Sequence, residues 1–282
     1  MVSEDRLGRK IDQLYELWSR RIAGEYDVDE FGFDTELTEQ VTLPLLRPLY
    51  RDWFRVETVG LDNVPKEGAA LLVGNHSGTV AMDALMVQLA LFDDHPAHRR
   101  LRLLAADFVF KAPVLGEYAR KTGATLASNA DAERLLRSGE IVGVFPEGVK
   151  GTGKPMWERY KLKRFGRGGF VATALTTGAP IIPVSIVGAE EIYPIIGEIP
   201  LLARLFNLPY FPVTPTFPWL GPLGAIPLPS KWIIEFGEPI ATQGLADLAD
   251  DPLEVFNLAD KVKETIQQTL HVLLERRGGA FQ

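Results

Sequence analysis

Short apolar runs recur through the central part of the chain, and stretches with helical spacing separate them. The runs that predict buried strands are Ala69–Val73, Leu101–Ala105, Ala124–Ala127, Ile141–Phe145, Ile181–Val187 and Trp232–Phe236. Apolar positions recur at helical spacing near Met82–Leu91, Asn129–Arg137 and Gly168–Thr177. This alternation is typical of an α/β fold, so we expect a mostly parallel central sheet that is flanked by helices.

Two amphipathic segments precede the first predicted strand. The first has a helical apolar stripe made of Leu7, Ile11, Leu14, Tyr15, Trp18 and Ile22. The second, roughly Leu45–Arg55, has an apolar side bordered by arginines, which suits either an interfacial membrane helix or a helix packed on the domain with a solvated basic edge. We therefore expect an N-terminal helical hairpin within residues 1–55, followed by one α/β domain over residues 56–282, which ends in a helix near Leu253–Arg277.

The longest uncharged stretch, Leu205–Ser230, has the length of a membrane span of about 20 residues. It contains seven prolines, which remove backbone donors and interrupt a helix. The sequence therefore predicts an irregular, extended loop that carries several aromatic side chains.

Charge and cysteine content narrow the classes of function. The net charge of −7 and the pI near 5.3 argue against a general nucleic-acid-binding protein. The sequence has no cysteine, which excludes disulfides, thiol catalysis and cysteine-ligated zinc. Residues 1–21 are rich in charge and lack the pattern of a secretory signal, so we expect a cytoplasmic protein.

Two polar motifs follow two of the predicted strands directly. Asn-His-Ser-Gly at residues 75–78, with Asp83 beyond it, follows Ala69–Val73, and Phe-Pro-Glu-Gly at residues 145–148 follows the run that starts at Ile141. Ligands of open α/β sheets gather at the carboxyl ends of the strands, so the motifs are expected to converge. A histidine with a carboxylate nearby is the minimum set for a general base, although His76 taken alone, without this context, fits better as a helix cap or as a partner of a loop carbonyl.

The order of these motifs resembles the glycerolipid, or lysophospholipid, acyltransferase superfamily. The resemblance covers roughly residues 50–240 and includes Ala179-Pro180-Ile181-Ile182-Pro183-Val184 as its last motif. It implies that His76 is the general base and that Asp83 orients it. It also implies that Phe145, Pro146, Glu147 and Gly148 help to bind the acceptor, that acyl-CoA or acyl carrier protein is the donor, and that no cofactor or metal is needed.

The spacing between His76 and Asp83 departs from the family pattern. The family has four residues between histidine and aspartate, whereas six intervene here. On a continuous helix the two side chains would lie about 10.5 Å apart along the axis, too far for a hydrogen bond of about 3 Å. We therefore predict that Ser77–Val80 forms a loop with Gly78 as its flexible position, that the helix starts late, and that Asp83 reaches His76.

In the family, an arginine that binds the phosphate of the acceptor follows a glycine and an apolar strand. In this sequence Asn129 stands at about the position of that arginine. Residues 150–167 hold seven lysines or arginines and one acidic residue, a local charge of +6. Asn129, Lys150 and Arg167 are therefore candidate ligands of an anionic acceptor or lipid, and a solvated charged loop is the alternative. The interleaved Trp157, Tyr160 and Phe165 favour a surface that touches ligand or membrane.

These features together predict acyl transfer to a hydroxyl of a lysophospholipid or related glycerolipid by a protein bound peripherally to a membrane. The sequence lacks a Gly-x-Ser-x-Gly nucleophile elbow and a glycine-rich phosphate loop. Transfer to a non-phosphorylated lipid alcohol or glycolipid, non-catalytic lipid binding, and thioester hydrolysis remain alternatives. Under this hypothesis, the Leu205–Ser230 loop either lines the acyl groove or enters the membrane interface beside the N-terminal helices. The alternative is that its aromatic side chains are buried in the core.

Overall fold

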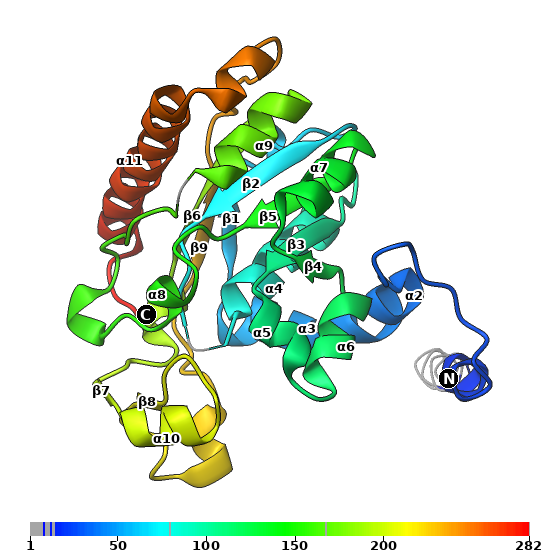
Figure 1. Cartoon of the computed structure of the whole chain (residues 1–282). Coiled ribbons are helices and arrows are strands. Elements are labelled where there is room, and N and C mark those ends of the chain that lie inside the picture. The colour runs from blue at the N-terminus through cyan, green and yellow to red at the C-terminus, as the bar shows by residue number, and fades with distance from the viewer. Residues whose placement is uncertain (1–7, 9–11, 13–14, 79, 167, 282) are drawn as a thin grey trace.

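The computed structural model describes the chain except for residues 1–7, 9–11, 13–14, 79, 167 and 282, and it contains a central seven-stranded sheet (Figure 1). The strands lie in the order β1 (Glu57–Val59), β9 (Ile233–Phe236), β6 (Ile181–Val187), β2 (Ala70–Gly74), β5 (Ile141–Val144), β3 (Leu101–Ala105) and β4 (Ala124–Leu126). Strand β9 is antiparallel to β6, and the other neighbouring strands are parallel. The predicted mostly parallel sheet is confirmed.

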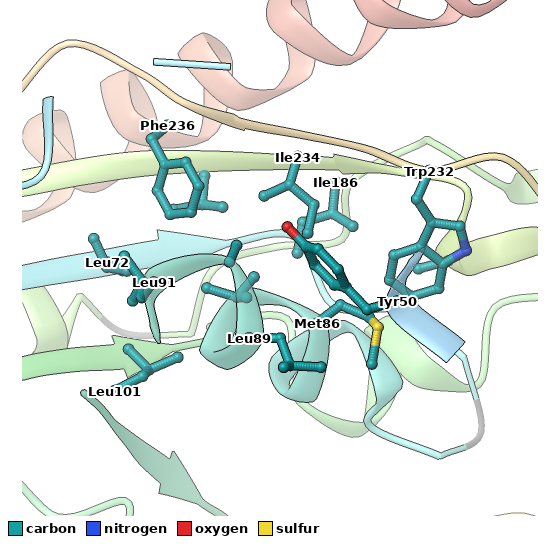
Figure 2. Packing of buried hydrophobic residues seen from close by; sticks show 14 of the residues in the cluster. Tyr50, Leu72, Met86, Leu89, Leu91, Leu101, Ile186, Trp232, Ile234 and Phe236 are labelled. Carbon is teal, nitrogen blue, oxygen red and sulfur yellow. The ribbon is translucent and has the colours of Figure 1, made fainter. Parts of the chain in front are cut away.

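Helices cover both faces of this sheet, which explains why β2 is buried along its whole length. Its side chains alternate, so that Leu72 belongs to one apolar core and Leu71 to the other. The first core includes α3 (Leu43–Pro48) and α4 (Met82–Leu89), and Figure 2 shows part of it around Tyr50, Met86 and Trp232. The second core includes α7 (Asn129–Arg137), α9 (Gly169–Thr177) and α11 (Pro252–Arg277).

The second N-terminal segment forms α3 and the wider helical turn η2 (Leu49–Trp53), and it packs against the domain. Phe54 is fully buried and stacks on Trp232 with ring centroids 4.7 Å apart. Arg47 and Arg51 form the basic edge of this segment, and both pair with Asp93. Of the two interpretations of this segment, the structure shows the packed helix.

The first N-terminal segment is helical over residues 15–22. Leu7, Ile11 and Leu14 lie outside the described residues, so the predicted stripe is only partly visible. Leu17 is buried, whereas Tyr15, Trp18 and Ile22 are exposed.

Residues 194–230 form a projecting part of the molecule, drawn in yellow in Figure 1, which we call the apolar lobe. It contains β7 (Gly197–Glu198), α10 (Pro200–Leu205), β8 (Pro212–Val213) and the turn η7 (Gly221–Ala225). The prediction of a wholly irregular loop is therefore wrong in part, because β7 and β8 pair with each other. Hydrogen bonds from Trp53 to the carbonyl of Pro227 (2.9 Å) and from Tyr193 to that of Ala225 (2.7 Å) fasten the lobe to the sheet domain.

Two short helices between β3 and β4 were not expected from the sequence, namely α5 (Asp107–Lys111) and α6 (Leu115–Lys121). Both are too short to show helical periodicity clearly. Among the described residues, no helix combines the length and the apolar character that crossing a membrane requires.

Candidate active site

The two strand-end motifs meet at the carboxyl ends of β2 and β5, as predicted. These strands are neighbours, and Val73 is paired with Val144 just before the motifs begin. The imidazole of His76 stacks on the ring of Phe145, with centroids 4.8 Å apart and planes inclined by 29°. The His76 side chain is 16% exposed, so the site is accessible at the carboxyl ends of the strands.

Asn75 anchors the histidine loop to β6. Its side-chain nitrogen donates to the carbonyl of Ile186 (3.0 Å), and the backbone NH of Ile186 donates to its side-chain oxygen (2.8 Å). The side chain is fully buried, and both of its polar atoms have hydrogen-bond partners. These two bonds fix the point where the chain leaves β2. Sequence reasoning assigned Asn75 no role, although a polar residue directly after a buried strand was a signal for one.

His76 and Asp83 form the expected hydrogen bond, with Nδ1 of His76 2.7 Å from Oδ2 of Asp83. The Asp83 carboxylate also accepts bonds from the backbone NH groups of Ser77 and Ala84, both at 2.8 Å. Because an ionised carboxylate only accepts hydrogen bonds, Nδ1 of His76 is the donor and Nε2 keeps its lone pair. The pair therefore has the geometry of a base and its orienting carboxylate.

The late start of α4 makes this hydrogen bond possible. The helix begins at Met82, so Asp83 lies in its first turn, and Gly78 has a φ of +78° in the preceding loop. A left-handed backbone of this kind is readily adopted by glycine. The predicted loop and the predicted contact are confirmed, with Thr79 outside the described residues.

Glu147 is the residue of the second motif that contacts the histidine loop. Its Oε1 accepts a hydrogen bond from the backbone NH of His76 (3.0 Å), and its Oε2 accepts one from that of Lys163 (2.6 Å). The Glu147 side chain is fully buried. Next to it, α8 (Val149–Thr152) packs so closely that a Cβ on Gly151 would lie 2.8 Å from the carbonyl oxygen of His76. The carboxylate thus joins the backbones of two loops at the site.

Lys154 belongs to the interior and not to a surface patch. Its ammonium lies 2.9 Å from Oε1 of Glu190 and 3.3 Å from Oε2 of Glu147, and its side chain is only 2% exposed. Burial raises the pKa of Glu190 to about 7, an effect that Lys154 opposes and the charge of Glu147 reinforces. The prediction that the lysines and arginines of residues 150–167 form a surface is therefore wrong for Lys154. No local pattern indicates the contact, because Lys154 and Glu190 are 36 positions apart.

The other aromatic and basic candidates have different environments. Trp157 is 66% exposed, whereas Tyr160 and Phe165 are buried in the core, so the predicted ligand or membrane surface is wrong for these two. Lys150 is exposed on α8. Arg167 lies outside the described residues.

Asn129 is exposed at the start of α7, which follows β4 at the edge of the sheet. Strands β5 and β3 separate β4 from β2, the strand that carries His76. The structure thus brings together His76, Asp83, Phe145 and Glu147, and among the described residues no hydrogen bond links Asn129 to them.

Comparison with known proteins agrees with this geometry. A family model described as Acyltransferase matches residues 55–187, which include both motifs. An uncharacterized protein of Mycobacterium tuberculosis is 58% identical over 263 residues, which span 93% of this chain and 74% of that protein. The chain belongs to the acyltransferase family. Its similarity to other named proteins is weaker.

One such relative is the human DGAT1/2-independent enzyme synthesizing storage lipids, which is 26% identical over 215 residues, covering 76% of this chain and 60% of that protein. The crystal structure of the 1-acyl-sn-glycerophosphate (LPA) acyltransferase PlsC from Thermotoga maritima has a TM-score of 0.53 and 21% identity. The superposed residues make up 82% of this chain and 79% of the PlsC chain, which shows that the two share a fold.

Proposed function

We propose that this family member transfers a fatty acyl chain from acyl-CoA or acyl carrier protein to a hydroxyl of a lysophospholipid or related glycerolipid. The observation that carries the proposal is the hydrogen bond between His76 and the buried Asp83, at the carboxyl end of β2 and beside the second motif. A base that is held in one tautomer at a partly exposed position is what deprotonation of an alcohol requires.

The reaction follows from the atoms of this pair. Nε2 of His76 takes the proton of the acceptor hydroxyl while the oxygen attacks the thioester carbonyl, and Asp83 stabilises the imidazolium that forms. The tetrahedral intermediate then expels the thiolate, which takes the proton from the imidazolium and leaves as a thiol. The acceptor oxygen attacks directly, so no acyl-enzyme is formed, and the chain has no cysteine that could hold one.

A non-phosphorylated lipid alcohol or glycolipid is the second candidate acceptor. Asn129, which is uncharged, takes the place of the family's arginine, and the human relative is named for synthesizing storage lipids. The exposed cations Lys150, Lys161 and Arg164 favour a phosphorylated acceptor instead. A non-catalytic lipid-binding role would not require the His76–Asp83 hydrogen bond.

An acceptor panel tests the proposed reaction. The purified protein is incubated with acyl-CoA or acyl carrier protein labelled in the acyl chain, and with lysophospholipid, glycerol phosphate or neutral lipid alcohols. We expect label in an ester lipid when a lysophospholipid is present. Label only in free fatty acid, at a rate independent of acceptor, would show a thioester hydrolase. Label in a neutral ester alone would select the second candidate.

We propose further that the apolar lobe places this site at a membrane surface on the cytoplasmic side. The lobe exposes large apolar side chains by 46% to 75% of their area, namely those of Ile196, Leu201, Leu205, Phe206, Leu208, Trp219, Leu220, Leu223 and Ile226. Among residues 194–230 only Glu198 and Arg204 are charged. An exposed apolar surface of this extent is typical of a contact with protein or membrane.

The segment that flanks the lobe is positively charged, and anionic lipid attracts positive charge. The backbone NH of Met156 donates to the carbonyl of Ile195 (2.8 Å), which joins the lobe to the turn after α8. Arg159 and Lys161 follow that turn and are exposed. Apolar side chains beside exposed cations favour a membrane that contains anionic headgroups.

Flotation with liposomes tests this surface. We expect the wild-type protein to float with anionic vesicles and the Leu201→Asp/Leu205→Asp variant to bind at least about tenfold more weakly, because burial of two leucines is lost. The matched control is Leu253→Asp/Val272→Asp, which changes two exposed residues of α11. A lobe variant that floats as well as the wild type would exclude the lobe as the contact.

A further inference from the structure

A buried chain of charged groups leads away from His76 into the protein. Its first member is Glu147, which accepts the backbone NH of His76 at 3.0 Å. The second is Lys154, whose ammonium lies 3.3 Å from Glu147. The third is Glu190, 2.9 Å from the same ammonium, which also accepts the backbone NH of Tyr160 at 2.9 Å. Glu190 lies directly after β6, the strand that holds Asn75.

The burial of these groups excludes direct contact with a bound substrate in this conformation. The side chains of Glu147, Lys154 and Glu190 are 0%, 2% and 4% exposed. Charges removed from water are costly unless they are paired, and removing one partner leaves an uncompensated charge. Each member therefore depends on its neighbour in the cluster to stay in place.

The cluster is also unbalanced, because two carboxylates share one ammonium. Burial raises the pKa of Glu190 to about 7, so near neutral pH Glu190 exchanges a proton while Lys154 stays close to both acids. Lys154 is the group that bridges them. Without it, the buried Glu147 faces a second carboxyl with no cation between them.

We propose that Lys154 and Glu190 are positioning residues for His76, because they hold the Glu147 carboxylate that fixes the His76 backbone. This inference rests on the proposed role of His76 as the base. Because Asp83 bonds the ring and Glu147 bonds the backbone, His76 is held from two sides. A shift of Glu147 moves the backbone of His76 relative to Asp83, and proton transfer requires atoms to be within about 2.6–3.2 Å.

Lys154→Met is the variant that tests the proposal, with Lys261→Met on the exposed side of α11 as its control. We expect kcat of Lys154→Met to fall by about tenfold to a hundredfold, since misplacement of about 1 Å has effects of this size. The KM for the acyl thioester stays within about twofold, because the substrate does not touch Lys154. Lys261→Met keeps wild-type values of both. Wild-type kcat in a folded Lys154→Met protein would overturn the proposal, and so would a change in KM alone.

A measurement that does not depend on activity separates this proposal from the proposed function. The chain has four histidines, so the ring nitrogens of His76 are assigned in a ¹⁵N spectrum by the loss of their signals in His76→Gln. In the wild type we expect Nδ1 to carry the proton, and in Lys154→Met a mixture of tautomers. An unchanged His76 spectrum in Lys154→Met would overturn the positioning role, even if the protein proved to have a different activity.

Glu190→Gln keeps the proposal testable if Lys154→Met does not fold. It keeps the size of the side chain and removes its charge, so Glu147 and Lys154 become a balanced pair. We expect Lys154→Met/Glu190→Gln to fold even where Lys154→Met does not, because the second buried carboxyl is gone, and to have a higher kcat than any folded Lys154→Met. A double variant with kcat equal to the product of the two single effects would show that the residues act independently and would overturn the proposal.

Discussion

Replacing His76 with alanine lowers kcat by at least about 10²–10⁴-fold, which is the usual contribution of a positioned general base. The hydrogen bond to Asp83 orients Nε2 as the proton acceptor, and the alanine variant has no group in that place. The KM for the acyl thioester changes little, because the base acts on the acceptor hydroxyl in the transition state. Single-turnover rates of acyl transfer, measured with saturating acceptor, report this step directly.

The stability of the variant is the control for this result. His76 is 16% exposed and stacks on Phe145, so its truncation removes some packing at the edge of the sheet and leaves both apolar cores intact. We expect a circular dichroism spectrum like that of the wild type. A folded His76→Ala protein with wild-type turnover would exclude His76 as the base.

Asp83→Asn gives the second large effect, a loss of about 10²–10⁴-fold in kcat with the fold retained. The asparagine has the same shape, but it can accept through only one of its two side-chain atoms. The Asp83 carboxylate accepts from Nδ1 of His76, the NH of Ser77 and the NH of Ala84, and the variant cannot accept all three in the same way. The His76 ring therefore loses its fixed tautomer.

The matched control for Asp83→Asn is Asp247→Asn, an exposed aspartate in the turn that precedes α11. The measurement is kcat together with the ¹⁵N spectrum of the His76 ring, in which the fixed tautomer of the wild type gives way to a mixture. Near-wild-type kcat in Asp83→Asn would mean that the carboxylate has a structural role only. Loss of kcat in Asp247→Asn would show that the assay responds to unrelated changes.

The sheet and the His76–Asp83 pair were predictable because they depend on short-range patterns. Apolar runs indicate strands without knowledge of their pairing partners. The rise per residue of a helix showed that a helix starting directly after His76 would place Asp83 too far away for a hydrogen bond. The observed start of α4 at Met82 and the 2.7 Å hydrogen bond follow from this geometric argument. The packing of Tyr50 and Phe54 was one of two interpretations, and only the structure decided between them.

The inner charge cluster was not predictable, because charge along a sequence does not reveal burial. Lys154 lies among the exposed residues Lys150, Arg159, Lys161 and Arg164, yet its ammonium is buried between Glu147 and Glu190. Tyr160 and Phe165 alternate with charged residues and are nevertheless buried, because the loop that carries them passes over the second core. The secondary structure of the apolar lobe was missed for a similar reason, since its short strands are defined by their pairing with each other.

The most direct test of the central claim is one transfer assay on three purified proteins: the wild type, His76→Ala and Lys261→Met. Each is incubated with the same labelled acyl thioester and lysophospholipid, and the label is followed into ester lipid and free fatty acid. We predict ester lipid from the wild type and Lys261→Met, and almost none from His76→Ala. Equal ester formation by His76→Ala, or label only in free fatty acid with the wild type, would contradict it.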